Sequence, residues 1–373
     1  MSSFDTKNYG FSFGSILIFA GSPLLLSGQY IWGGLCIVLA LVIRASKATS
    51  GSNEVEAPLT NFSPGDLLEK LNQIAESAVD SNVAKSKNKS SDTLYVADEE
   101  TRINLYVEGL SILGRKYNKS NHKDKLSLQY QELSFKLICL HPKNDQVVAG
   151  SISLLALVAK NAMVRERFIH QSDDYGLNRP IYVLKKVIQR AREEEDESKE
   201  AFLAEILRKG CLFLGAISSD GQNLGLPSII VSEGGLELIL EAANWFRLHE
   251  DVSNWALWAI FTLCYDNLSI KAELVRSKGI QVICRLMKNN PTSLEVNRHG
   301  TALLFDLMRE NHEENTGAWN PWEVRKIAIA SGLHNLVLSA MNEFSDSTDI
   351  VMMGQEILVG TNYRGEVPKY KQG

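Results

Sequence analysis

Few residues of this 373-residue sequence have the type and spacing that catalysis or metal binding requires. Arg298-His299-Gly300 places a cation beside an imidazole, but it lies in a stretch that predicts a buried helix with no strand before it. His249, His312 and His334 are isolated, without partners at the spacing of metal ligands. Phosphate-binding loops, dinucleotide-binding glycine motifs, His-Glu-x-x-His and Gly-x-Ser-x-Gly do not occur. We therefore expect neither an enzyme nor a cofactor or metal site, and no small-molecule substrate.

Charge and cysteine content bear on the remaining classes of protein. The net charge of −5 and the pI near 5.9 give no general attraction to nucleic acid, so none is expected as a partner. The cysteines are odd in number, form no Cys-x-x-Cys pair and mostly fall in apolar helical runs. Such cysteines are typical of small core side chains in a reducing compartment. They are Cys36, Cys139, Cys211, Cys264 and Cys284.

The central stretch, residues 254–287, predicts three helices. Its first part, residues 254–267, is apolar nearly all round, which a helix tolerates only when other helices cover it on several sides. Two shorter amphipathic helices follow between Lys271 and Met287, separated by Gly279. We expect Gly279 to adopt the left-handed backbone of a sharp corner between helices. A buried helix, a polar break and a helix–Gly–helix corner are typical of a three-helix solenoid repeat.

The pattern recurs along the chain. The corner glycines Gly235, Gly279 and Gly332 lie 44 and 53 residues apart. The first spacing falls within the roughly 40–47 residues of armadillo and related repeats, and a loop at residues 310–321 lengthens the second. The buried-helix pattern is found at residues 150–161, 206–219, 254–267, 297–311 and 349–362.

With its buried third helix, polar turn and Leu-Val-x-x-Gly-Gly-Ile-type corner, this pattern resembles the armadillo repeat. The resemblance implies an all-α fold, an α-solenoid of roughly five armadillo-like repeats over residues 146–362. Residues 63–145 predict helices that cap the solenoid, beginning with Ser63 as a helix cap and Pro64 in the first turn. Residues 363–373 predict a polar, frayed tail.

A long uncharged segment precedes the helices. No charged residue occurs between Lys7 and Arg44, and residues 11–43 are apolar with few breaks, longer than the roughly 18 residues that indicate a membrane segment. Two layouts fit this segment. Residues 24–43 can form a single span, or residues 11–26 and 30–43 can form a short helical hairpin with a polar hinge between them.

The flanking residues indicate how the chain is oriented. Residues 1–10 predict a short cytosolic stub, and residues 44–62, rich in small polar residues, predict a flexible tether. Arg44 and Lys47 place the bulk of the chain in the cytosol by the positive-inside rule. The endoplasmic reticulum and the mitochondrial outer membrane both fit, and the short hairpin favours the thinner bilayer of the endoplasmic reticulum.

An armadillo-like solenoid offers a concave groove lined by successive third helices, and the resemblance implies that a protein binds there. In importin-type armadillo proteins each third helix carries a Trp followed four residues later by an Asn. Trp255 matches the Trp, but Ala259 occupies the Asn position, so only the fold and a general partner-binding role carry over. The expected partner-binding residues are Trp255, Trp258, Thr262, Arg298, Trp319 and Trp322, with one of the first two in the core and the other in the groove.

The sequence thus predicts a membrane-anchored interaction scaffold. Residues 11–43 contact lipid, and the solenoid recruits a protein partner from the cytosol. The alternative is a structural role, in which the hairpin shapes or oligomerises in the bilayer and the solenoid is a spacer.

Overall fold

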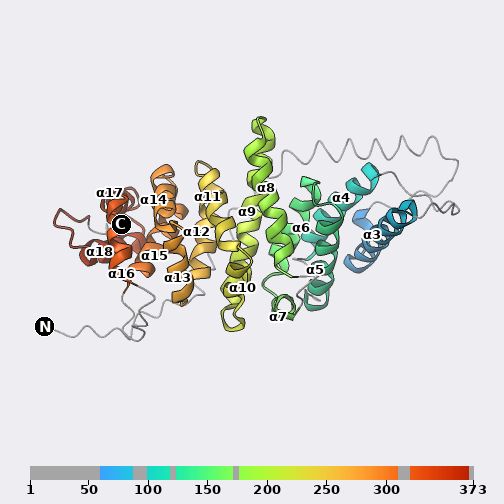
Figure 1. The fold of residues 1–373 in the computed structure, drawn as a ribbon, viewed down its shortest axis with the longest axis horizontal. Coiled ribbons are helices and arrows are strands. Elements are labelled where there is room, and N and C mark those ends of the chain that lie inside the picture. Colours follow the sequence, from blue (N-terminus) through green and yellow to red (C-terminus); the bar gives the residue numbers. More distant parts are fainter. Residues whose placement is uncertain (1–58, 87–98, 118–122, 171–175, 310–319, 369–373) are drawn as a thin grey trace. The chain divides into compact units, whose positions relative to one another are not determined.

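The structure of the chain is a computed structural model that describes residues 59–86, 99–117, 123–170, 176–309 and 320–368. Over these residues it consists of 16 α-helices and two 3-10 helices, without a strand (Figure 1). The predicted all-α fold is therefore confirmed for the described part of the chain. The helices are η2 (Leu59–Asn61), α3 (Pro64–Ser86), α4 (Glu99–Tyr117), α5 (Lys123–Leu140), α6 (Asp145–Val158), α7 (Ala162–His170), α8 (Asn178–Glu193), α9 (Glu197–Asp220), η3 (Gln222–Leu224), α10 (Leu226–Ser232), α11 (Gly235–Trp245), α12 (Glu250–Cys264), α13 (Leu268–Arg276), α14 (Gly279–Asn289), α15 (Leu294–Met308), α16 (Pro321–Ala330), α17 (Leu333–Glu343) and α18 (Thr348–Gly360).

The chain divides into two units, residues 1–58 and residues 59–373. The predicted stub, the membrane segment 11–43 and most of the tether lie outside the described residues. Among the helices that are described, none is by itself long and apolar enough to cross a membrane. Helices α6 and α7 pass that test only as a pair, bent by 111° at the break between them.

The second unit begins earlier than the sequence predicts. Leu59 is buried at the start of η2, and the Lys116 ammonium of α4 donates to the Thr60 carbonyl at 2.9 Å. The last residues of the predicted tether 44–62 are therefore packed, because one leucine and one cation fix them to α4. The Ser63 hydroxyl then accepts from the Asp66 amide at 3.2 Å and caps α3, as predicted.

The longer helices form two rows in which each member packs on the next. One row, here called the inner row, runs α4, α6, α9, α12, α15, α18, and the other runs α3, α5, α8, α11, α14, α17. The short helices α7, α10, α13 and α16 each precede a pair of row helices from α8 onward. The neighbours of α12 explain why its sequence is apolar nearly all round. Five helices contact it: α9, α10, α11, α13 and α15. Its Ala256, Leu257, Ala259, Ile260 and Leu263 are completely buried.

Each inner-row helix from α9 onward carries a small residue where it meets the helix of the other row that directly precedes it in the chain. A Cβ added at Gly210 would lie 2.7 Å from Leu184 of α8. Gly300 would likewise meet Met287 of α14 at 2.6 Å, and Gly354 would meet Met341 of α17 at 2.6 Å. The equivalent residue of α12 is Ala256. The close approach of the two rows therefore depends on the absence of a larger side chain at this position.

The corner glycines Gly235, Gly279 and Gly332 occupy the predicted places, but only Gly332 has the left-handed backbone. Gly332 has the left-handed φ of 91°. At the other corners the left-handed residues are Gly234 and Lys278, with φ of 78° and 59°, one residue before Gly235 and Gly279. A Cβ at Gly279 would lie 2.1 Å from Leu274 Cδ1, so close packing rather than the sign of φ requires glycine there.

The predicted frayed tail is wrong up to Pro368. Tyr363 and Val367 pack against the core, and the Gln355 amide of α18 donates to the Pro368 carbonyl at 3.1 Å. The sequence prediction considered only the polar residues of the tail and missed its two apolar side chains, four residues apart.

The corner packing generates a test on the full-length chain. In Gly279→Ala the new methyl group collides with Leu274, so we expect the free energy of unfolding to fall by about 1–3 kcal/mol. Gly114→Ala in α4 is the matched control, because a Cβ there meets no neighbouring atom within 4 Å. That variant should be unchanged or more stable by up to ~1 kcal/mol. Urea unfolding followed by circular dichroism compares the two, and equal losses would contradict the packing role.

Candidate protein-interaction surface

A ladder of aromatic side chains runs along the open side of α12. Trp255, Trp258 and Phe261 are half-buried and Tyr265 is 39% exposed. Their spacing of three and four residues keeps them on one side of the helix. The Trp255 and Trp258 rings meet edge to face with centroids 5.5 Å apart, and the Phe261 and Tyr265 centroids are 6.2 Å apart. We call these four residues the aromatic face.

Trp258 is held in place by the neighbouring helix. A Cβ at Gly215 of α9 would lie 2.4 Å from Trp258 Cζ3, so the indole ring lies directly on the backbone of α9. The sequence predicts one of the two tryptophans in the core and the other in the groove. Both are instead half-buried: the two rings contact each other, and α9 covers the Trp258 ring further.

Thr262 does not belong to this surface. Its side chain is 1% exposed and its hydroxyl donates to the Ala259 carbonyl at 2.9 Å. The Thr262 carbonyl accepts from the Gln222 amide at 2.6 Å, so Thr262 joins α12 to the segment after α9. The prediction of Thr262 as a groove residue is wrong, since one step along the helix from Phe261 turns the side chain into the core.

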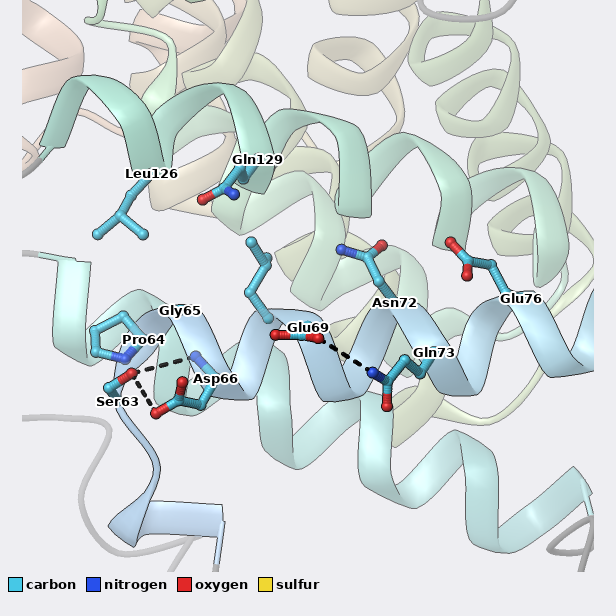
Figure 2. Close-up of a pocket in the computed structure, with 11 residues that line it drawn as sticks. Ser63, Pro64, Gly65, Asp66, Glu69, Asn72, Gln73, Glu76, Leu126 and Gln129 are labelled. Atoms are coloured by element: carbon cyan, nitrogen blue, oxygen red, sulfur yellow. Dashed lines mark hydrogen bonds between the residues drawn. The ribbon is translucent and has the colours of Figure 1, made fainter.

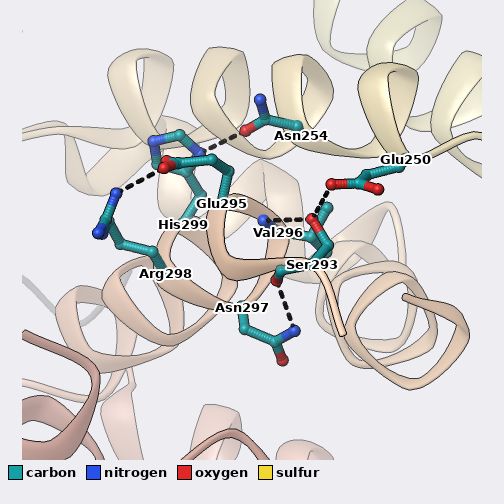
Figure 3. A network of polar contacts seen from close by, with 8 residues as sticks. All are labelled: Glu250, Asn254, Ser293, Glu295, Val296, Asn297, Arg298 and His299. Carbon is teal, nitrogen blue, oxygen red and sulfur yellow. Dashed lines mark hydrogen bonds and ion pairs between the residues drawn. The ribbon is translucent and has the colours of Figure 1, made fainter. Parts of the chain in front are cut away.

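Arg298 lies beside the aromatic face, on the next helix of the inner row. Its guanidinium pairs with Glu295 at 2.7 Å, one turn earlier on α15, and the side chain remains 26% exposed. The adjacent His299 imidazole Nδ1 lies 2.8 Å from the Asn254 amide oxygen, across the junction of α12 and α15 (Figure 3). Burial, and to a smaller extent the charge of Arg298, lower the pKa of His299 to about 4. At neutral pH His299 is therefore uncharged and donates to Asn254.

A polar ladder continues this junction beneath the aromatic face. The Ser293 hydroxyl donates to Glu250 at 2.6 Å and caps α15 by accepting from the Val296 amide (Figure 3). Asn297, 3% exposed, donates to the Ser293 carbonyl at 2.8 Å and to the Asn290 carbonyl at 3.0 Å. Buried amides that are fully bonded fix the register of two helices more strictly than apolar packing does. The Asn297 bonds fix the turn before α15, and the Ser293–Glu250 and His299–Asn254 bonds hold α15 against α12.

Helix α9, which precedes α12 in the inner row, carries a set of paired charges near the start of α12. The Arg208 guanidinium binds Glu205 through two nitrogens, and Lys209 lies 3.5 Å from the same carboxylate. Burial raises the pKa of Glu205, but the hydrogen bond and charge of Arg208 outweigh it and leave that pKa lowered. A cavity of about 330 Å³ lies between this part of α9 and the start of α12, where His249 and Asp251 line it.

The two remaining predicted residues do not join this surface. Trp319 lies outside the described residues. Trp322 is 56% exposed on α16, where the Arg325 guanidinium lies 4.6 Å above its ring. Helix α16 packs against α14, α15 and α17 and does not belong to the inner row. The structure therefore brings Trp255 and Trp258 together, places Arg298 on the neighbouring helix α15 and leaves Trp322 apart from them.

A larger cleft, of about 990 Å³, lies between α3 and α5 (Figure 2). The carboxylates along it already have local partners, since Asp66 accepts from Ser63 and Glu69 from Gln73. Glu76 pairs with Lys136 of α5 at 3.0 Å. These exposed contacts make the cleft a solvated seam between two helices rather than a built site.

The groups that chemistry would need are dispersed or shielded. No cluster of three potential metal ligands occurs among the described residues. Burial raises the pKa of the Cys211 and Cys284 thiols to about 12 and also raises that of Cys264, so these thiols stay protonated. Cys139 is exposed.

The chain matches no protein-family model, no curated protein and no solved structure.

Phe261 and Tyr265 are the surface residues that sequence reasoning missed. A signal for them was present, because they continue the spacing of three and four residues that begins at Trp255. Both were assigned from the sequence to the buried helix 254–267. A helix that is apolar on nearly every side does not show which of its sides lacks a covering helix.

The lowered pKa of His299 predicts a pH dependence of stability. The imidazole binds a proton near pH 6.5 in the unfolded chain and only near pH 4 in the folded one, so the unfolded state takes up the extra proton in between. The stabilisation is complete above pH 6.5 and is lost as the pH falls toward 4. Melting temperatures of the full-length chain and of His299→Gln should therefore converge over this range. A difference that stays constant from pH 7 to 4 would contradict the assignment.

Proposed function

We propose that residues 59–368 form an α-solenoid of the armadillo type and that the chain is a binding protein rather than an enzyme. Two observations support the solenoid. From α6 to α18, each inner-row helix contacts the inner-row helix that comes three helices later in the chain. From α9 onward, each of these helices also has a small residue where it meets the helix of the other row that precedes it in the chain. The five inner-row helices α6, α9, α12, α15 and α18 correspond to the five predicted third helices.

The aromatic face is the proposed binding surface for a partner protein, and it is the observation that carries the proposal. Trp255, Trp258, Phe261 and Tyr265 present open ring surface in one line, although the chain covers the apolar residues on the other sides of α12. Tyrosine and tryptophan that combine burial on one side with exposure on the other are the residue types that dominate binding energy at interfaces. The charges on both flanks, Arg208 and Arg298, are already paired within the chain. Apolar and aromatic groups of the partner are therefore expected to supply most of the affinity.

The membrane anchor completes the proposed function. Residues 11–43 are proposed to insert in the membrane, as a hairpin or a single span, and to hold the solenoid at the cytosolic surface of the endoplasmic reticulum or the mitochondrial outer membrane. The sequence of that segment supports this, through its length without charge and the basic residues Arg44 and Lys47 after it. In such an arrangement the anchor fixes the location and the aromatic face selects what is recruited.

Binding through the aromatic face can be tested by affinity capture with the full-length chain. We expect Trp255→Ala with Tyr265→Ala to weaken capture of the partner about 30-fold, because loss of an anchoring aromatic residue costs about 2 kcal/mol or more. Tyr182→Ala is the matched control, since Tyr182 is 54% exposed on α8, outside the inner row. A protein captured equally by all three chains binds elsewhere. If the only association found is self-association through residues 1–45, the alternative role as a membrane spacer holds.

The topology is tested by protease protection of sealed vesicles that carry the chain with a tag at each end. Both tags should be cleaved from the cytosolic side if residues 11–43 form a hairpin. A protected N-terminal tag indicates the single span, and in both layouts the C-terminal tag is accessible. A protected C-terminal tag, or a chain that leaves the vesicles in carbonate buffer, contradicts the proposed anchoring.

A further inference from the structure

Helix α16 exposes two large apolar side chains on one side. Trp322 is 56% exposed and Ile329 is 41% exposed, and a spacing of seven residues places them on the same side of the helix, about two turns apart. The other side of α16 is buried through Val324 and Ala328. Neither exposed residue belongs to the aromatic face, so the proposed binding of a partner protein does not use them.

Two cations lie between these apolar residues. Arg325 and Lys326 follow Trp322 by three and four residues and therefore share its side of the helix. The Arg325 guanidinium lies 4.6 Å above the Trp322 ring and donates to the Met308 carbonyl at 2.9 Å, so the end of α15 helps to hold the ring in place. Lys326 is exposed, and its ammonium has no partner among the described residues. We call Trp322, Arg325, Lys326 and Ile329 the α16 face.

The charge of this region is opposite to that of the whole chain. Arg309 is exposed next to the Met308 carbonyl that Arg325 binds, and it adds a third cation. Glu323 is the one carboxylate of α16, whereas the complete chain has a net charge of −5. A basic region with exposed tryptophan and isoleucine favours an anionic partner that also accepts apolar side chains.

The surroundings of the α16 face favour a membrane surface over an acidic protein. Neither of the two cavities described above is lined by a residue of α16. A protein partner has to supply pockets that match Trp322 and Ile329 in shape, whereas lipids rearrange around an inserted side chain. Tryptophan prefers the boundary between water and hydrocarbon, and Arg and Lys bind the anionic groups that lie there.

We propose that the α16 face is a contact site for an anionic phospholipid surface. Trp322 and Ile329 enter the boundary between headgroups and acyl chains, while Lys326 and Arg309 bind the anionic headgroups. The inference rests on the proposed anchoring through residues 11–43 only for the nearness of a bilayer. Because the anchor makes the second contact intramolecular, even a weak contact is occupied. The solenoid thereby gains an attachment that depends on lipid charge.

The contact is tested with the full-length chain in vesicles that contain a phospholipid with a photoreactive acyl chain. Mass spectrometry measures lipid adducts on the α16 peptide and on residues 11–43 separately. With ~30% phosphatidylserine we expect α16 adducts to exceed those in pure phosphatidylcholine about fivefold or more, the gain that one cation provides near an anionic surface. Adducts on residues 11–43 should not depend on the composition.

Point substitutions assign the adducts to the α16 face. Trp322→Ser with Ile329→Ser should abolish them, and Lys326→Glu should lower them about fivefold or more in the phosphatidylserine vesicles. Met163→Ser is the matched control and should leave them unchanged, since Met163 is 49% exposed on α7, another short helix. Circular dichroism checks that each variant keeps its helix content.

The two sets of adducts separate this inference from the proposed anchoring. An α16 peptide without adducts in phosphatidylserine vesicles overturns the inference and leaves an acidic protein as the occupant, even where residues 11–43 are labelled. Adducts that survive Trp322→Ser with Ile329→Ser overturn it as well. Residues 11–43 without adducts contradict the anchoring, and α16 adducts then establish the lipid contact alone.

Discussion

The close approach of helices at single small residues is the constraint on which the rest of this structure depends. Gly210, Gly300 and Gly354 allow a leucine or methionine of the facing helix to lie against the helix backbone itself. Ala256 at the equivalent place in α12 adds only one methyl group. A larger residue there would push the inner row away from its partner row, and the displacement would pass to the next inner-row helix. The glycines thus set the spacing that brings Trp258 onto Gly215 and Asn254 onto His299.

Much of this arrangement could be predicted from the sequence because apolar pattern and glycine spacing are local signals. The all-α fold, the five buried helices, the Ser63 cap and the places of the corner glycines follow from them. The role of Gly279 could not be predicted, since a missing Cβ beside Leu274 and a left-handed backbone select the same residue type. Thr262 and Tyr265 were misassigned for a related reason. Their exposure depends on which neighbouring helices cover α12. That depends on how the helices pack together and not on the local sequence of residues 254–267.

The aromatic face differs from the corresponding parts of its neighbours in the kind of side chain it exposes. Helix α9 presents Glu205 and Arg208, and helix α15 presents Glu295 and Arg298, each pair joined within its own helix. Exposed pairs of this type contribute little to stability and keep a surface soluble. The four aromatic rings of α12, which lies between α9 and α15, do not keep the surface soluble in this way. An apolar strip bordered by neutralised charges favours a ligand that brings apolar groups and disfavours one that depends on a net charge.

Polar groups in the interior are hydrogen-bonded to different extents along the row of helices. Around the turn between α14 and α15 the buried amides of Asn290 and Asn297 have several bonds each. In the earlier helices α5 and α6, Gln131, Ser134 and Ser151 are completely buried, and their side chains have no protein partner among the described residues. The Thr301 hydroxyl of α15 is in the same situation, and a buried polar group without a bond costs about 1–3 kcal/mol. In the proposed solenoid the stability is close to a sum over neighbouring repeats, so each of these costs stays local to its own helices. In the proposed scaffold the aromatic face therefore keeps its geometry independently of the helices near the start of the described residues, α3 to α6.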